Sequence, residues 1–274
     1  MTGNRTGRVL LYALLVLGAI LAILPLVWMV SASLMPTGAA NTYPPRLFPR
    51  TVTLEHYRAI FTRLEMGRYL LNSALIALSV TGISLLINSL AGYAFAKLRF
   101  RGRDRVYRVL MTGLVIPVQV AMLPLFLMFK EMGLINSYWG VIVPSMASIF
   151  GIFLIRQYAL AIPDDLLDAA RIDGAGELRI YRSIVLPAIV PILATLAIWT
   201  FLTTWNDFMW PLIVLSDDAK YTLPVALANL SGEHVQDTEL MMAGSVVTVL
   251  PVLLVFLFLQ RYYVQGIMAG SVKG

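Results

Sequence analysis

Cysteine is absent from this chain of 274 residues, and only two histidines are present. Without cysteine the chain has no disulfides, no thiolate metal ligands and no cysteine nucleophile, and its redox compartment stays undetermined. His56 and His234 stand far apart in the sequence, and neither belongs to a recognised metal-binding motif. We therefore interpret both histidines as surface residues.

A phosphate-binding loop of the form G-x-x-x-x-G-K-S/T is also missing from the sequence. Because that loop holds the phosphates of bound ATP in a large class of ATPases, we expect that this chain does not itself bind and split ATP. The sequence predicts no cofactor and no metal.

Charged residues make up only 13% of the chain, whereas 59% of it is hydrophobic and the mean hydropathy is +0.79. Soluble globular domains are roughly 45 to 50% apolar, so we expect much of this surface to face a membrane. Six runs lack Asp, Glu, Lys, Arg and His. Each is long enough to cross about 30 Å of hydrocarbon as a helix. The runs lie within residues 9–30, 69–96, 109–129, 133–155, 183–206 and 240–260.

Backbone groups in lipid must bond to one another, and continuous apolar runs favour helices over the alternating strands of a barrel. The sequence therefore predicts an all-α membrane protein with six transmembrane helices in a single domain, residues 1–274. The first run is longer than the roughly 7 to 15 apolar residues of a signal peptide, and it contains Pro25 and Trp28. We expect it to be retained as a span.

Orientation follows from a short loop between the second and third runs, in which basic residues are dense. Such loops stay on the cytoplasmic side of the membrane. With six spans, both termini are then inside, and loops 31–68 and 207–239 are outside. Five arginines in loop 31–68 oppose this assignment, but that loop is long and carries less weight. The dense loop contains Lys97, Arg99, Arg101, Arg103, Arg105 and Arg108. The net charge of +6 is explained by such placement, and we expect no nucleic-acid partner.

The two predicted outer loops contain short segments that cannot span a membrane. In loop 31–68, a proline-containing stretch leads into LEHYRAIF, which predicts a short interfacial helix. After the fifth run, FMWPLIVLS is apolar but too short to cross alone. Trp205, Trp210 and Pro211 indicate that this segment folds back at the outer interface, where aromatic rings are favoured.

A charged island, residues 163–187, reads PDDLLDAARIDGAGELRIYRSIVLP. Pro163 suits the first turn of a helix, and two aspartates complement the positive helix end. Gly174 suits a left-handed position where that helix ends, and a second helix runs from Glu177 into the fifth span. On composition alone, a solvated surface helix is the plainer interpretation.

The spacing of Asp168-Ala169-Ala170, Gly174, Ile184 and Leu186-Pro187 resembles the EAA loop of permease subunits of ATP-binding cassette importers. Asp168 replaces the usual glutamate of that loop, which keeps the charge but shortens the side chain. In the family, this cytoplasmic loop forms a coupling helix that enters a cleft on the nucleotide-binding subunit. The resemblance implies this ATPase-coupling role for Asp168, Ala169, Ala170, Gly174, Leu186 and Pro187.

Weaker matches, in the same order along the chain, resemble the smaller permease of maltose-type carbohydrate importers. They are Asn72-Ser73, residues 91–96, 205–208 and 210–212, Gln265-Gly266 and Ala269-Gly270. The resemblance implies a multi-pass protein of the cytoplasmic or inner membrane. It also implies a second permease subunit in a heterodimer, two nucleotide-binding ATPase subunits that use the ATP, and an extracytoplasmic solute-binding protein. Loop 207–239 is then either a solvated turn or a contact with that protein.

Polar groups within the spans are few and uncharged, so the sequence offers no candidate proton relay. Hydrogen bonding between helices is the plainer role for each of them, and lining a sugar path is the sharper alternative. The candidates for the path are Asn88, Gln119, Thr200, Thr203, Thr204 and Asn206.

Three other functions stay open at this point. The cargo could be another small solute, such as an oligopeptide, a polyamine or glycerol phosphate. A stand-alone channel or carrier is a second alternative. A membrane enzyme built on Asp207 is the third, although no second acid, histidine or metal cluster accompanies that carboxylate.

Overall fold

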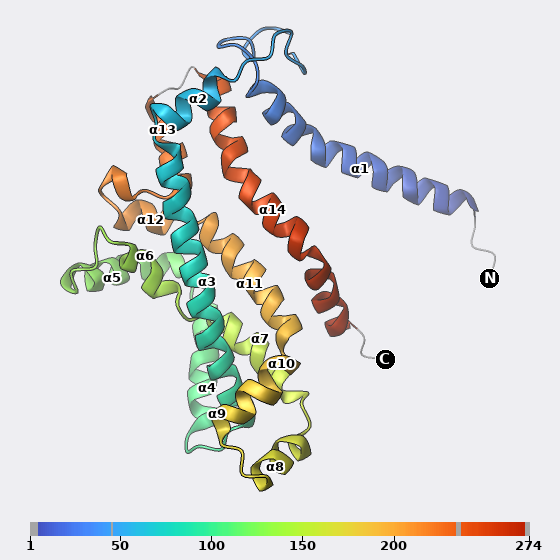
Figure 1. Cartoon of the computed structure of the whole chain (residues 1–274), viewed down its shortest axis with the longest axis vertical. Helices are drawn as coiled ribbons and strands as arrows, with labels where there is room; N and C mark the ends of the chain where they lie inside the picture. Colours follow the sequence, from blue (N-terminus) through green and yellow to red (C-terminus); the bar gives the residue numbers. More distant parts are fainter. Residues whose placement is uncertain (1–4, 45, 234–236, 272–274) are drawn as a thin grey trace. The chain divides into compact units, whose positions relative to one another are not determined.

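The computed structural model describes residues 5–44, 46–233 and 237–271, and all regular elements in those ranges are helices (Figure 1). This confirms the predicted all-α class. The α-helices are α1 (Arg5–Ala32), α2 (Glu55–Thr62), α3 (Met66–Lys97), α4 (Arg103–Thr112), α5 (Val118–Glu131), α6 (Tyr138–Ser145), α7 (Ile149–Leu160), α8 (Asp164–Ile172), α9 (Glu177–Ile180), α10 (Leu186–Ala188), α11 (Val190–Trp205), α12 (Met209–Val214), α13 (Leu223–Glu233) and α14 (Thr238–Ser271). Two 3₁₀ turns, η1 (Gly113–Val115) and η3 (Asp218–Lys220), and a π-helix, η2 (Tyr181–Val185), complete the set.

Within the described residues, four stretches are long and apolar enough to cross a membrane: Gly7–Ala32, Met66–Lys97, Tyr138–Leu160 and Thr238–Phe258. Two further spans result if bent helix pairs are each counted as one. The first pair, Arg103–Val115 with Val118–Glu131, is bent by 106°, and the second, Glu177–Ala188 with Val190–Trp205, by 78°. The chain therefore has four to six candidate spans, in the regions that the apolar runs predicted.

Proline explains why two of the predicted straight spans are bent. Ile116 and Pro117 both have extended backbone, with ψ of 118° and 130°, and they separate η1 from α5. A residue before proline is pushed out of the α region, and proline lacks the N–H that would continue the helix. Hydropathy alone does not detect such breaks, because proline interrupts a helix without adding charge.

The chain divides into two compact units, residues 1–68 with 226–251 and residues 69–225 with 252–274. In the first unit, the segment after α1 packs its Met35 and Ala40 against Met242 of α14. Glu239 of α14 is fully buried and accepts a hydrogen bond from the backbone N–H of Ala40 at 2.6 Å. The segment that follows α1 is thus anchored to α14.

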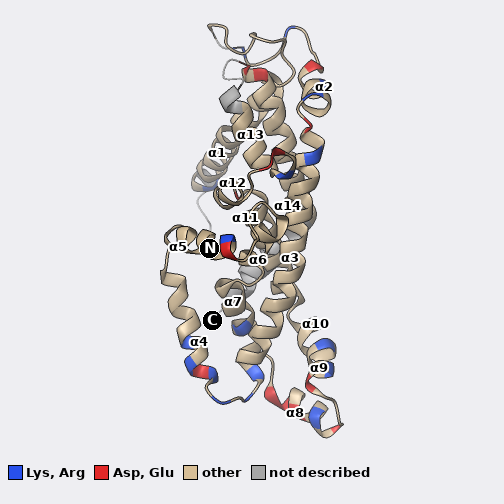
Figure 2. Ribbon diagram, turned by 90° about the vertical axis from the view of Figure 1, so that its left-hand side faces the viewer, with Lys and Arg blue, Asp and Glu red and all other residues tan. Residues whose placement is uncertain are grey.

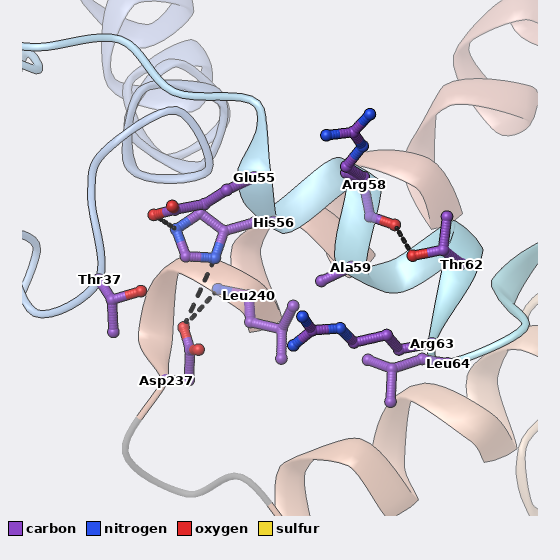
Figure 3. A pocket seen from close by; sticks show the side chains of 10 residues that line it. All are labelled: Thr37, Glu55, His56, Arg58, Ala59, Thr62, Arg63, Leu64, Asp237 and Leu240. Atoms are coloured by element: carbon purple, nitrogen blue, oxygen red, sulfur yellow. Dashed lines mark hydrogen bonds and ion pairs between the residues drawn. The ribbon is translucent and has the colours of Figure 1, made fainter.

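His56 is buried in this unit, with 3% of its surface exposed, so its interpretation as a surface residue was wrong. Its Nε2 lies 2.9 Å from the carbonyl oxygen of Met35, and its Nδ1 lies 3.9 Å from Oδ1 of Asp237. It lines a pocket of about 450 Å³ between α2 and the start of α14 (Figure 3). These partners are distant in sequence, so local pattern did not indicate burial. His234 lies outside the described residues.

In the second unit, two apolar clusters hold the helices together. One joins α3, α7, α8 and the segment 180–196, and the other joins α3, α5, α6 and α12. Gly92 lets α3 and α7 approach closely, because a Cβ added there would lie 2.7 Å from Cγ2 of Ile155. Close helix approach through small residues is typical of membrane helix packing.

The apolar segment after α11 does not cross a membrane but folds into α12, as predicted. Trp210 is buried there, and its indole N–H donates to the carbonyl oxygen of Gly140 at 2.9 Å. Its ring also packs edge-on against Phe129, with centroids 6.0 Å apart. Trp210 is therefore a core residue of this unit, which differs from the interfacial ring that the sequence predicted.

Candidate functional site

The charged island forms the predicted helix, α8, and the helix begins one residue after Pro163. Pro163 is the N-cap, with extended backbone (φ −60°, ψ 133°). Asp164 and Asp165 occupy the first turn, and Arg171 lies in the last turn. Acids at the start and a base at the end both complement the helix dipole. The sequence thus fixes the limits of α8 through ordinary helix-end chemistry.

Lys97, the last residue of α3, holds the start of α8. Its ammonium donates to the carbonyl oxygen of Ile162 at 2.6 Å and to Oδ1 of Asp164 at 2.7 Å. The Lys97 side chain is only 5% exposed, so this position is fixed by its surroundings. The hydrogen bond and charge of Lys97 hold the pKa of the Asp164 carboxyl below its usual range. Lys97 therefore ties α3 to α8.

The two faces of α8 have different surroundings. Leu167 is buried in the apolar cluster, and Ala170 packs against the same cluster. Leu166, Ala169 and Ile172 are exposed, and Ile172 is 86% exposed. Their spacing of three residues places them on one face of the helix. One alanine of the pair thus faces the chain's own core, and the other lies in an outward apolar strip.

Arg171 links α8 to α9 and, through Glu177, to α3. One guanidinium nitrogen donates to Oδ1 of Asp168 at 2.6 Å, and Nε donates to Oε1 of Glu177 at 2.8 Å. The hydroxyl of Tyr93, a buried residue of α3, donates to Oε2 of Glu177 at 2.5 Å. Glu177 and Asp168 together raise the pKa of Arg171 above its usual range. We call Asp168, Arg171, Glu177 and Tyr93 the polar relay.

The relay continues into the π-helix by ring contact. The rings of Tyr93 and Tyr181 lie with centroids 5.8 Å apart, and the hydroxyl of Tyr181 lies 2.6 Å from Oγ of Ser89. Tyr181 is the first residue of the π-helix. Single π-turns inside helices are frequent at functional sites. A continuous set of contacts therefore runs from α8 to α3 and to the segment that enters α11.

Gly174 has the left-handed backbone that the sequence predicted, with φ of +80°. Its N–H donates to the carbonyl oxygen of Arg171 at 3.0 Å, and the N–H of Ala175 donates to that of Ala170 at 2.9 Å. These bonds satisfy carbonyls at the end of α8. A side chain at Gly174 would have open space but an unfavourable backbone.

Leu186 and Pro187 form the short helix α10 between the π-helix and the 78° bend. Leu186 packs partly against the apolar cluster, whereas Pro187 is exposed. Pro187 has no N–H to donate to the carbonyl four residues earlier, and Pro191, one turn later, also lacks a backbone N–H. The predicted continuous helix from Glu177 into the fifth span is thus interrupted at Ile189.

A hollow of about 830 Å³ lies beside α8 and is lined by both signs of charge. Asp164, Asp168 and Arg171 line it from α8, and Lys97 and Arg103 line it from the end of α3 and the start of α4. Figure 2 shows acidic residues on α8 and basic residues where α3 and α4 meet. The hollow could therefore accept a polar side chain of either sign.

Two of the residues predicted for a solute path lie inside the helix packing. Asn88 is 0% exposed, and its amide donates to Oγ of Ser84 at 2.7 Å and accepts from the N–H of Ser148 at 3.0 Å. Thr200 is also buried. For these two residues the geometry favours the plainer role, hydrogen bonding and packing between helices.

Thr203 and Asn206 are exposed and share one face of α11 with Trp199. Oγ1 of Thr203 donates to the carbonyl oxygen of Trp199 at 2.9 Å, a bond within the helix. Thr204 is half-buried, and Gln119 is exposed in the first turn of α5. The structure therefore groups Thr203 with Asn206 but places the other candidates elsewhere.

Sequence reasoning did not identify Lys97, Tyr93 and Glu177 as parts of the site. The sequence indicates Lys97 only as a topology signal, and Tyr93 only as part of a weak motif. Glu177 follows Arg171 by six residues across a turn, so helical spacing does not pair them. A basic residue directly after a long apolar run was the one signal that pointed to Lys97.

The described residues contain no group of three or more His, Cys, Asp and Glu that could hold a metal ion. Asp207, the carboxylate considered for an enzyme, is half-buried between α11 and α12. Burial raises the pKa of Asp207, and the backbone N–H of Trp210, 3.4 Å from its Oδ1, opposes that shift. That bond gives Asp207 a structural role at the start of α12.

Comparison with known proteins finds similarity to membrane components of transport systems. The sequence pattern of a family described as "Binding-protein-dependent transport system inner membrane component" matches residues 88–268. The arabinooligosaccharides transport system permease protein AraQ of Halalkalibacterium halodurans is 39% identical over 261 residues, which is 93% of each chain. The lactose transport system permease protein LacG of Rhizobium radiobacter is 35% identical over 274 residues, or 98% of each chain.

Two solved structures share the fold. A chain in the crystal structure of a bacterial ABC transporter involved in import of the acidic polysaccharide alginate superimposes with a TM-score of 0.85. It is 23% identical, and the match covers 96% of this chain and 99% of that one. A second structure, of a bacterial alginate ABC transporter in complex with alginate pentasaccharide-bound periplasmic protein, gives 0.64 at 18% identity, with 93% and 94% covered.

Proposed function

The chain belongs to the family of binding-protein-dependent transport system inner membrane components, and from this membership we propose that it is the permease subunit of an ATP-driven sugar importer. Relatives named for arabinooligosaccharides and for lactose support an oligosaccharide cargo. In this proposal each bent helix pair counts as one span, which gives six. Both termini and loop 163–187 then face the cytoplasm, and loops 31–68 and 207–239 face outward.

The proposed assembly contains a second permease subunit, two ATPase subunits and a solute-binding protein. The family's description as a binding-protein-dependent system supports the last of these, as does the fold shared with a transporter seen in complex with a periplasmic protein. The outward strip of Leu166, Ala169 and Ile172 supports an ATPase contact. Exposed apolar side chains on an otherwise polar loop are stabilised when a partner covers them.

The polar relay is the observation that carries the coupling mechanism. When the ATPase subunits close, they displace α8, and Arg171 transmits that displacement through Glu177 to Tyr93 of α3. Lys97 provides a second attachment between α8 and α3. The π-helix and the 78° bend let the same movement reorient α11. A differential contact energy of a few kcal/mol is sufficient to change which of two helix arrangements is populated.

The solute path of the proposed importer lies along the exposed polar side chains of the spans. Thr203 and Asn206 on α11 are the foremost candidates, because both are exposed on one face. Gln119 and Thr204 are secondary candidates from the sequence. Threonine and asparagine side chains supply the donors and acceptors that sugar hydroxyls require.

Co-purification and uptake test the proposal together. The tagged chain, expressed with its genomic neighbours, is expected to bring down a nucleotide-binding ATPase and a second permease in stable stoichiometry. Proteoliposomes of that complex should take up an oligosaccharide only with ATP and the solute-binding protein. Uptake by the chain alone without ATP would show a stand-alone carrier instead. Uptake of glycerol phosphate, a polyamine or an oligopeptide, but no sugar, would overturn the cargo assignment.

A further inference from the structure

Five arginines lie at the junction of α3 and α4, and none of them belongs to the polar relay. Between residues 97 and 108 the chain has six basic residues and one acidic residue. Figure 2 shows these basic residues gathered at the ends of the two helices. We call Arg99, Arg101, Arg103, Arg105 and Arg108 the arginine collar.

Most of the collar forms no ion pair in the described part of the chain, although the charge of Arg99 contributes to the lowered pKa of the Asp164 carboxyl. Arg103 pairs with Asp104 at 3.0 Å, and Arg108 donates only to a backbone carbonyl oxygen, at 3.3 Å. No hydrogen bond or ion pair within the described residues engages the guanidinium groups of Arg99, Arg101 and Arg105, and all three are exposed. Like charges held this close repel one another unless an anion lies between them.

The collar lies at the level where a membrane-crossing helix ends. Candidate span Met66–Lys97 stops two residues before Arg99, and the next candidate, a bent pair, starts at Arg103. A helix that spans the hydrocarbon brings its flanking residues to the headgroup layer. We therefore expect the guanidinium groups to lie near the headgroup layer, within reach of lipid phosphates.

Exposed apolar side chains adjoin the collar. Val106 and Val109 are exposed on α4, and Val109 is 72% exposed. Phe100, between two collar arginines, is also exposed. A segment that joins cations to exposed valine and phenylalanine matches the composition of helices that lie in the membrane interface.

The collar arginines line a hollow of about 710 Å³ together with Phe100, Gly102 and the carboxylate of Asp104, which pairs with Arg103. We propose that this hollow binds the phosphate groups of anionic phospholipids in the leaflet that borders the coupling loop. Clusters of four to eight basic residues beside a membrane span attract anionic lipid, and arginine can grip a phosphate with two parallel hydrogen bonds. Because Arg103 also lines the hollow beside α8, lipid bound at the collar would lie next to the coupling site.

Lipid retention measures this binding directly. The full-length chain, purified with the subunits that accompany it, is placed in nanodiscs of equimolar phosphatidylglycerol and phosphatidylcholine, and the lipid that stays bound after detergent extraction is counted. Wild type should retain phosphatidylglycerol in excess. The variant R99Q/R101Q/R105Q should retain at least about tenfold less of it, since each arginine near an anionic surface contributes to attraction.

Two matched variants separate this role from general charge and from orientation in the membrane. R50Q/R58Q/R63Q removes the same charge from exposed arginines of loop 31–68 and should leave retention unchanged. R99K/R101K/R105K keeps the charge that orients the span and should keep most of the retention, with a partial loss because lysine lacks the guanidinium fork.

Four results would overturn the proposal. Wild type could retain both lipids equally, or the loop 31–68 variant could lose as much phosphatidylglycerol as the collar variant. Inorganic phosphate could displace the retained lipid, which would indicate a site for a free anion. The collar variant could also keep its lipid but no longer co-purify with the ATPase, which would indicate an acidic protein surface as the partner.

Discussion

At the scale of single residues, Arg171 determines how the coupling loop is held. Its guanidinium contacts Asp168 within α8 and Glu177 beyond the turn, and Glu177 contacts Tyr93 of α3. The EAA loop of importer permeases usually has glutamate at the position of Asp168. In this chain the Asp168 carboxylate accepts a hydrogen bond from Arg171 of the same chain. The shorter aspartate reaches Arg171 three residues later on the same helix face.

Replacing Arg171 should weaken coupling more than folding. Arg171→Gln removes the charge-assisted bonds to Asp168 and Glu177, which should weaken the interaction that links α8 to α3 by about 1 to 2 kcal/mol. We expect roughly tenfold less sugar transported per ATP hydrolysed, with thermal stability little changed. Arg179→Gln, an exposed arginine of the same loop, is the control and should behave as wild type. Equal transport per ATP in both variants would remove Arg171 from the mechanism.

Gly92 is a packing residue, and its replacement should act on stability. In Gly92→Ala the new Cβ would meet Ile155 at 2.7 Å, and Ile155 is fully buried. Overpacking of this kind costs about 1 to 3 kcal/mol, so the unfolding temperature of the purified chain should fall. Gly82→Ala lies in the same helix with open space and should leave that temperature unchanged or slightly raised. A similar fall in both variants would contradict the close approach of α3 and α7.

At the scale of elements, the ion pair between Lys97 of α3 and Asp164 of α8 has a defined dependence on pH. Lys97 lowers the pKa of Asp164, so the stabilisation from this pair is present above the ordinary aspartate range near 3.9. It is lost only as pH falls through the lowered value. Amide exchange of α8, corrected for intrinsic rates, should therefore stay constant from about pH 5 to 8.

Asp164→Asn should speed exchange in α8 across that whole pH range, because the amide cannot form the ion pair. Asp165→Asn, in the same helical turn, is the control and should exchange as wild type. A step in wild-type exchange between pH 5 and 8 would show that another group governs the start of α8.

The elements themselves were largely predictable, and their bends were not. Uninterrupted apolar runs indicated where helices lie, and Pro163 and Gly174 marked the limits of α8. The 106° and 78° breaks arise at prolines within apolar runs, where hydropathy stays high. Burial of His56 depended on Met35 and on α14, which no local pattern brings together. The relay was missed for the same reason, since Tyr93 and Glu177 are 84 residues apart.

At the scale of the whole molecule, the proposed function requires that events at α8 control the spans. The described residues leave the apolar strip on α8 exposed, whereas the opposite face of α8 packs against the core that contains Tyr93 and Tyr181. A helix held firmly on one side and open on the other suits the transmission of force from a partner.

Gly174→Val tests coupling most directly, with uptake and ATP hydrolysis measured in the same proteoliposomes. Valine at a φ of +80° costs about 1 to 2 kcal/mol and should distort the end of α8. Gly176 has a φ of −71°, which valine tolerates, so Gly176→Val is the matched control. We predict that Gly174→Val keeps ATP hydrolysis while sugar uptake falls at least about tenfold. Normal uptake together with normal stimulation of ATP hydrolysis by the solute-binding protein would contradict the account.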